Sequence, residues 1–292
     1  MITFLRRRGL GRTSCNEMAR LIREMGGQAQ VVRNDGYQSI PHEGMVVRWG
    51  CTSNIYRPTE ASLRQRGTAS NVTVINDSSS IHLCNDKVES RMLLQDAGVP
   101  VPRTWLSIEE WLAADAPKYL SFITRPRTHS QGRHLLRSMD PDTIRQFLLE
   151  HGGGYISEYI PKVREVRVFV VEGRVVWVAE KTPGNPDDVA WNVARGGRFD
   201  NVKWSEWPMR AVVAAVDAAN VVGVDFAGVD VMLDAEGNPY VLELNSAPSQ
   251  TSPYRQLCSA KVFKWMHDHR GETLPIVTEG GWKEYIHPAI RS

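Results

Sequence analysis

The sequence predicts an α/β protein that contains α+β subdomains. Strand-like and helix-like patterns alternate along 292 residues, and no internal repeat or low-complexity segment interrupts them. A composition of 42% hydrophobic and 23% charged residues is typical of a globular chain that can bury two or three subdomain cores. The net charge of +2 is too small to favour a nucleic-acid partner, and aspartates interrupt the most apolar region, so no membrane span is expected.

Residues 1–80 predict a small N-terminal α/β domain with a mainly parallel sheet. Apolar residues at helical spacing predict a helix over residues 11–25, ended by two glycines. The runs AQVVR, GMVVRWG and NVTVIND predict strands. The opening MITFLRRRGLGR is interpreted as a strand or loop edge whose basic run, Arg6 to Arg8, is solvated; the alternative is a phosphate-binding patch.

Residues 81–157 predict a central unit built around a polar loop. The segment NDKVESRMLLQDAGVPVP predicts a helix capped by Asn85 and ended at Gly98. The segment YLSFITRPRTHSQGRHLLR predicts two strands around a glycine-containing loop. A helix capped by Asp140 and the strand YISEYIP follow.

Residues 158–292 predict a C-terminal unit that begins with a hairpin turning at Glu172-Gly173. Two further strands are expected to join around Glu236-Gly237, and a helix is expected from Pro253 to about residue 269. Between the strand pairs, WPMRAVVAAVDAANVVG predicts a helix. Its expected apolar face is Val212, Val213, Val216 and Ala219.

The four cysteines are widely separated and form no Cys-x-x-Cys pair. This spacing argues against a metal finger or a redox motif and favours reduced, mostly buried thiols. We therefore expect a cytoplasmic protein.

The last pair of predicted strands carries polar side chains where the pattern expects apolar ones. In a hairpin around Glu236-Gly237, residues whose numbers sum to about 473 face each other, so Asp230 lies opposite Glu243 and Asn245 lies on the same face. Oxygen donors without His or Cys suit magnesium, with substrate phosphates completing the shell. The alternative is an acid and an amide that bind loop backbone at a sheet edge.

The segment GVDVML…GNPYVLELNSAPS closely resembles the last motif of the ATP-grasp superfamily, in the form found in RimK-type carboxylate–amine ligases such as ribosomal-protein glutamate ligases. The resemblance implies an ATP-grasp fold, in which two α+β subdomains sandwich ATP beside a small N-terminal α/β domain. It also implies two Mg²⁺ ions, with Mn²⁺ as an alternative, on Asp230, Glu243 and Asn245.

Upstream segments resemble the phosphate-binding parts of the same family. FITRPRTHSQGR resembles the strand and glycine loop over the phosphates, which implies ATP contacts from Arg125, Ser130 and Gly132. The family usually has Lys-Pro where this chain has Arg125-Pro126, so a planar guanidinium replaces a compact ammonium. Lys87 matches a lysine that reaches ATP phosphate; the alternative is a lysine on a helix surface.

The segment ISEYIPKVREVRVFVV resembles the hinge between the two ATP-binding subdomains. The resemblance places Glu158 near the adenine amine and Glu165 on the ribose hydroxyls. Pro161 has no N–H, so the donor to the adenine ring would come from a neighbour such as Ile160 or Lys162. The expected nucleotide contacts along the hinge are Glu158, Tyr159, Ile160 and Glu165.

The segments REVR, AEK and WNVARGG match family positions around the triphosphate and the acyl-phosphate. The resemblance implies that Arg167, Lys181 and Arg195 are catalytic and that Asn192 contacts the nucleotide. Without the resemblance, Arg167 could be an outward-facing charge on a strand.

The implied activity is ATP-dependent ligation of a carboxylate to an amine through an acyl-phosphate, with release of ADP and phosphate. The expected substrates are an amino acid, a peptide or a protein tail, and relatives often form dimers or tetramers. Two alternatives remain open. One is an ATP-grasp kinase that phosphorylates a small acceptor, and the other is a non-catalytic ATP-binding module.

Overall fold

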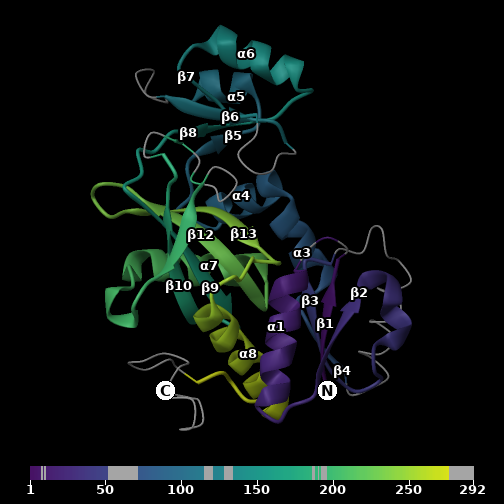
Figure 1. The fold of residues 1–292 in the computed structure, drawn as a ribbon. Coiled ribbons are helices and arrows are strands. Elements are labelled where there is room, and N and C mark those ends of the chain that lie inside the picture. The colour runs from purple at the N-terminus through teal and green to yellow at the C-terminus, as the bar shows by residue number, and fades with distance from the viewer. Residues whose placement is uncertain are drawn as a thin grey trace.

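The computed structural model describes residues 1–7, 9, 11–51, 72–114, 121–127, 134–185, 188–189, 191 and 196–275, without the side chains of residues 36–38. Its strands form three sheets that follow one another along the chain (Figure 1). Among the residues described, no helix is long and apolar enough to cross a membrane.

The N-terminal sheet has four parallel strands in the order β2-β1-β3-β4. They are β1 (Ile2–Arg6), β2 (Ala29–Arg33), β3 (Gly44–Trp49) and β4 (Val72–Ile75), with the 3-10 turn η1 (Asn34–Ser39) after β2. Helix α1 (Arg12–Glu24) covers one face. The opening segment forms a strand, which was one of the two interpretations, and β1 lies inside the sheet with its apolar run buried on both faces. Arg6 and Arg7 are half-buried, and Arg8 lies outside the described residues.

Two short helices, α3 (Ser78–Asn85) and α4 (Lys87–Asp96), lead out of this sheet. The expected cap Asn85 is wrong, because Asn85 ends α3 and Asp86 caps α4 by accepting from the backbone N–H groups of Val88 (3.1 Å) and Glu89 (3.0 Å). Helix α3 was not expected, since its serine-rich start is typical of a loop. Asp77 nevertheless caps it.

The central sheet has four antiparallel strands in the order β5-β8-β6-β7. They are β5 (Thr104–Trp105), β6 (Phe122–Arg125), β7 (Leu136–Ser138) and β8 (Tyr155–Glu158). Helices α5 (Ile108–Ala113) and α6 (Pro141–Glu150) lie on the side away from the rest of the molecule (Figure 1). The cap Asp140 is confirmed, because its carboxylate accepts from the Thr143 N–H at 2.9 Å.

The C-terminal sheet has five antiparallel strands in the order β11-β10-β9-β12-β13. They are β9 (Arg164–Val171), β10 (Arg174–Thr182), β11 (Arg198–Asn201), β12 (Phe226–Leu233) and β13 (Pro239–Asn245), with the 3-10 turn η3 (Trp204–Glu206) after β11. The predicted hairpin turn is confirmed, because Glu172 and Gly173 join β9 to β10 with φ values of 43° and 70°.

Helix α7 (Met209–Val222) covers one face of the C-terminal sheet and packs on Val166, Val168 and Val170. The expected apolar face of α7 is partly wrong, because Val213 is 54% exposed. Nearly every position of this helix is apolar, so hydrophobic periodicity cannot identify the buried side. The buried side is mainly alanine: Ala211, Ala214, Ala215, Ala218 and Ala219.

The opposite face of the C-terminal sheet begins with an aromatic half, which consists of Phe169, Trp177 and Phe226. The rings of Phe169 and Trp177 stack with centroids 5.0 Å apart, and Phe226 stacks on Trp49 of the N-terminal sheet at 5.1 Å. Helices α1 and α8 (Pro253–Asp268) complete the same core. The first and third sheets therefore share one hydrophobic core.

All four cysteines are buried and none forms a disulfide, as the sequence predicted. Burial raises the pKa of the Cys84 thiol to about 12. Burial also raises the pKa of Cys51 to about 12, against the opposing charge of Arg48. Such thiols carry little thiolate at neutral pH and are poor nucleophiles.

Candidate active site

Beyond the aromatic half, the same face of the C-terminal sheet becomes charged. Strand pairing places Arg167 of β9 beside Asp230 of β12, and Asp230 beside Glu243 of β13. Side chains two apart in a strand share a face, so Glu165 lies on this face with Arg167. The charged half of the face consists of Glu165, Arg167, Lys181, Asp230, Glu243 and Asn245.

The predicted register is confirmed, because Asp230 pairs with Glu243 and Gly228 pairs with Asn245. Nearer the turn, Val231 pairs with Val241, so a bulge leaves Leu242 as an extra residue. A regular strand would place Leu242 with Leu244 on the core side, but the bulge leaves Leu242 half-buried outside the core. Its carbonyl accepts from Arg91 Nη2 at 3.2 Å, while Val241 and Leu244 fill the core.

Gly228 makes room for the chain that follows β13. A Cβ at this position would lie 2.8 Å from the Cβ of Pro248 and 3.2 Å from the Cδ of Arg167. The segment after Asn245 therefore folds back over the sheet beside the charged half.

Arg167 and Asp230 form a buried, two-point ion pair. Arg167 Nε and Nη2 donate to the two Asp230 oxygens at 2.6 and 2.8 Å, and Lys181 Nζ donates to the same carboxylate at 3.3 Å. Asp230 is 2% exposed, and this burial alone would raise its pKa. The charges of Arg167 and Lys181 outweigh burial and hold the pKa of Asp230 well below its ordinary value.

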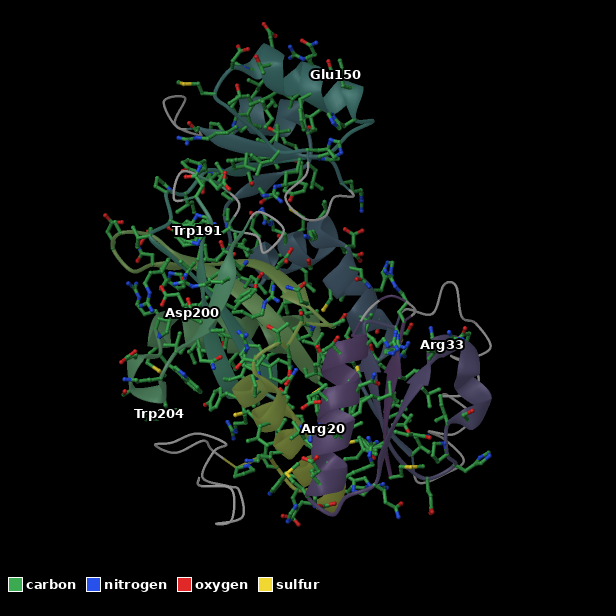
Figure 2. The ribbon with its side chains drawn as sticks, viewed as in Figure 1. Arg20, Arg33, Glu150, Trp191, Asp200 and Trp204 are labelled. Atoms are coloured by element: carbon green, nitrogen blue, oxygen red, sulfur yellow. The ribbon has the colours of Figure 1, made fainter. Side chains whose placement is uncertain are left out.

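Glu165 is also buried and lies between two lysines. Its carboxylate accepts from Lys181 and from Lys162, whose side chain was not expected at this place. The Lys162 ammonium lies 4.5 Å from the ring centre of Trp191, the side chain labelled between the central and C-terminal sheets in Figure 2. Burial lowers the pKa of Lys162 even though Glu165 opposes the shift.

Glu243 forms an ion pair with a residue of helix α4. Its carboxylate accepts from Lys87, the first residue of α4, and from Asn245 Nδ2 at 3.2 Å. Burial would raise the pKa of Glu243, but the charge of Lys87 lowers it below the ordinary value. Lys87, which could have been a surface lysine, therefore lies at the site.

The donor set fits a divalent cation that also binds phosphate. Asp230, Glu243 and Asn245 offer hard oxygens on rigid neighbouring strands, and both carboxylates already face cationic side chains. Within the described part of the chain, no group of three or more His, Cys, Asp or Glu could hold a metal by itself. Oxygens from a substrate would therefore have to complete the shell.

The predicted hinge connects the central sheet to the C-terminal sheet. Glu158 ends β8, and its carboxylate accepts from the Arg103 N–H at 3.3 Å. The N–H of Tyr159 donates to Ser121 O at 3.0 Å, and Arg137 stacks on the Tyr159 ring at 3.7 Å. Ile160 follows as a half-buried residue before β9 begins.

Arg125 ends β6 and faces the charged half from the central sheet. Burial lowers the pKa of its guanidinium, while the charges of Glu243 and Glu165 oppose the shift. The structure thus brings Arg125 toward the same acids as Lys87 and Lys181. The remaining predicted residues, Ser130, Gly132, Asn192 and Arg195, lie outside the described residues.

Besides Lys162, a second charged side chain at the site was missed. Arg255 lies in the first turn of α8, and its guanidinium carbon is 5.7 Å from the ring centre of Phe199, which also contacts Arg167. The available signal was a basic residue in the first turn of a predicted helix, where the helix dipole disfavours a cation.

A family model described as RimK-like ATP-grasp domain matches residues 84–260, which is more than half of the chain. A probable alpha-L-glutamate ligase of Aeromonas salmonicida is 27% identical over 229 residues, covering 74% of this chain and 73% of that protein. The alpha-aminoadipate–LysW ligase LysX of Sulfurisphaera tokodaii is 28% identical over 192 residues, covering 62% of this chain and 66% of that protein.

Among solved structures, the ATP-grasp ligase PsnB, complexed with minimal precursor, Mg and ADP, matches with a TM-score of 0.60 at 18% sequence identity. The match covers 90% of this chain and 97% of that chain. It confirms the predicted fold.

Proposed function

This chain is a ligase that belongs to the family of RimK-like ATP-grasp domains, and we propose that it uses ATP to join a carboxylate to an amine. The proposed substrates are an amino acid as one partner and an amino acid, a peptide or a protein tail as the other. Relatives named as ligases for glutamate and for alpha-aminoadipate support this class of substrate.

The reaction requires activation because a carboxylate is a poor electrophile at neutral pH. A carboxylate oxygen attacks the γ-phosphorus of ATP, the bond to the ADP oxygen breaks, and an acyl-phosphate forms. The amine then attacks the acyl carbon, phosphate leaves with the electrons of the C–O bond, and the nitrogen loses a proton. The protein contributes mainly positioning and charge neutralisation.

The charged half supplies groups suited to this work. We assign Arg167 and Lys181 to the transferring phosphoryl group, because both are buried cations on rigid strands. Lys87 and Arg125 are assigned to the ATP phosphates, and Glu165 to the ribose hydroxyls. Asp230, Glu243 and Asn245 would hold Mg²⁺, which would supply positive charge to neutralise the phosphates, and two ions are proposed.

The ion pairs give these cations a fixed direction. Asp230 holds the planar guanidinium of Arg167 at two points, so little side-chain entropy remains to be lost when an anion binds. Glu165 holds Lys162 and Lys181 in the same way. Preorganised charges of this kind are the main source of electrostatic catalysis.

The observation that carries the proposal is the row of Arg167, Asp230 and Glu243 across three neighbouring strands, with Asn245 on the same face. It is tested by incubating the full chain with ATP, Mg²⁺ and amino acids, singly and in pairs, and measuring ADP release. Mass spectrometry of the positive mixtures should find an amide that contains both substrates. A stable phosphorylated product without an amide would identify a kinase, and absence of ADP release from every mixture would favour a non-catalytic module.

A further inference from the structure

Arg255 lies where the charged half meets the aromatic half. It is 4% exposed, and its guanidinium carbon lies 5.6 Å from the ring centre of Trp177 and 5.7 Å from that of Phe199. The Phe199 ring also lies 4.8 Å from the guanidinium carbon of Arg167 and 5.4 Å from Lys181 Nζ. Three cations therefore surround one aromatic ring.

Unlike its neighbours, Arg255 has no hydrogen bond or ion pair among the residues that the structure describes, and its Nε is fully buried without a partner. The acid whose charge favours it is Asp200, labelled in Figure 2, which lies beyond ion-pair distance. The Asp200 side chain is 54% exposed and already accepts from Thr182 and Arg198. Stacking on aromatic rings offsets only part of the desolvation cost of a buried guanidinium.

Two further features disfavour a cation at this place. Burial lowers the pKa of Arg255, and the positive charge of Arg167 lowers it further. Arg255 also belongs to the first turn of α8, whose N-cap Ser252 makes no side-chain capping bond. The first N–H groups of a helix have no acceptor within the helix and carry partial positive charge. An anion bound here would offset the desolvation of the guanidinium, its repulsion by Arg167 and the positive end of the helix dipole.

The neighbouring acids do not supply that anion. Glu165 is held by Lys162 and Lys181, and Asp230 by Arg167 and Lys181. Neither acid forms an ion pair with Arg255. Arg255 therefore takes no part in the ion pairs among the residues that we assign to ATP and the metal ions, although it borders the same face of the sheet.

We propose that Arg255 binds a carboxylate of one substrate that is not the carboxylate being activated. The planar guanidinium fork matches a carboxylate at two points. Phe199 contacts both Arg255 and Arg167, which places Arg255 beside the charged half. The ligase therefore selects a substrate that keeps a free carboxylate near the new amide bond. Calling the ligand a substrate rests on the proposed function, whereas the anion site itself does not.

The anion site is tested without turnover by thermal unfolding of the full chain. Wild type, Arg255→Gln and the control Lys264→Gln, which changes a lysine of α8 paired with Asp268, are melted in chloride, acetate and L-glutamate at constant ionic strength. Without the organic anions, Arg255→Gln should melt at the wild-type temperature or above, because an unpaired buried charge is removed. Acetate or L-glutamate should raise the melting temperature of wild type and of Lys264→Gln, but not of Arg255→Gln. Equal shifts in all three proteins, or no shift in any, would contradict the site.

The choice of substrate is tested with a pair of substrates that supports ADP release. Arg255→Gln should raise KM for one of them by about tenfold to a hundredfold while KM for ATP stays near the wild-type value. With wild-type protein, the spare carboxylate is replaced by a carboxamide first in the acid substrate and then in the amine substrate. The replacement that raises KM to the same extent as Arg255→Gln identifies the substrate that Arg255 binds. Arg255→Lys should recover part of the loss. If the anion shift is present but KM is unchanged, the assignment to substrate is wrong and the anion site stands.

Discussion

The two halves of one sheet face use the same strands for opposite purposes. In the aromatic half, Phe169, Trp177 and Phe226 bury large apolar surfaces against the N-terminal sheet and α8. In the charged half, the same strands β9, β10 and β12 bury Arg167, Lys181 and Asp230. Apolar burial stabilises the fold, whereas buried ion pairs contribute little net stability because desolvation offsets their attraction. The charged half therefore indicates function, supported by the rigidity of the aromatic half.

Removing an aromatic ring should produce the largest loss of stability. Phe226→Ala leaves a cavity next to Trp49, Phe169 and Phe263, and we expect the free energy of unfolding to fall by about 3–5 kcal/mol. Denaturant titration measures the change. Leu149→Ala, at a position on α6 that is 75% exposed, should change stability by less than about 0.5 kcal/mol. An equally small effect at Phe226 would remove the proposed contrast between the two halves.

Removing Arg167 should affect both stability and turnover. Arg167→Met leaves the buried carboxylate of Asp230 with Lys181 alone, so unfolding free energy should fall by about 3 kcal/mol and ADP release by about a hundredfold. The double variant Arg167→Met/Asp230→Asn removes both charges and should recover most of the stability but none of the turnover. Recovery of turnover in the double variant would show that the pair is structural.

Lys87 lies at the edge of the charged half and should show a smaller effect. Its pair with Glu243 is about one-quarter exposed on each side, so Lys87→Met should cost at most about 1 kcal/mol of stability. If Lys87 contacts ATP phosphate, KM for ATP should rise about tenfold, as expected for one lost charged hydrogen bond. Steady-state kinetics at varied ATP decide the point. An unchanged KM for ATP would show that Lys87 does not contact the ATP phosphates.

Asp225, which precedes β12, should give the smallest effect, with a pH dependence opposite to that of Asp230. Burial raises the pKa of Asp225, and the charge of Asp77 adds to the shift, although the Asn76 N–H opposes it. A raised pKa means that the folded state holds this proton more tightly than the unfolded chain. Stability from this group is therefore present below about pH 4 and is lost as pH rises through the raised pKa. Relative to Asp225→Asn, wild type should lose stability between pH 4 and neutrality, and parallel stability curves would contradict the assignment.

Local signals in the sequence predicted much of this structure. The Glu172-Gly173 turn set the β9–β10 register, and the turn at Gly237 set the pairing of Asp230 with Glu243, because short hairpin loops leave few registers. The bulge at Leu242 was not predicted, because it depends on contacts from outside the hairpin such as the bond from Arg91. Helix α3 was missed because its serines favour a loop locally.

The pattern of side chains on the site was predictable only in part. Oxygen donors at alternate positions of neighbouring strands predicted that Asp230, Glu243 and Asn245 share a face, and the strand pairing confirms this. The side-chain pairing of Lys162 with Glu165 and the unpaired burial of Arg255 could not be predicted, because both depend on how elements distant in sequence pack together. Tertiary packing, rather than local pattern, thus sets which cations reach the charged half.

The central claim is that the charged half holds the metal and phosphates of a ligase, and ADP release by Glu243→Gln tests it most directly. The matched control is Glu180→Gln, because Glu180 on β10 pairs with Arg164 outside the charged half. With saturating ATP, Mg²⁺ and a substrate pair, Glu243→Gln should release ADP about a thousandfold more slowly than wild type while its circular dichroism spectrum is unchanged, and Glu180→Gln should match wild type. Undiminished ADP release by Glu243→Gln would contradict the metal assignment and with it the account of this face.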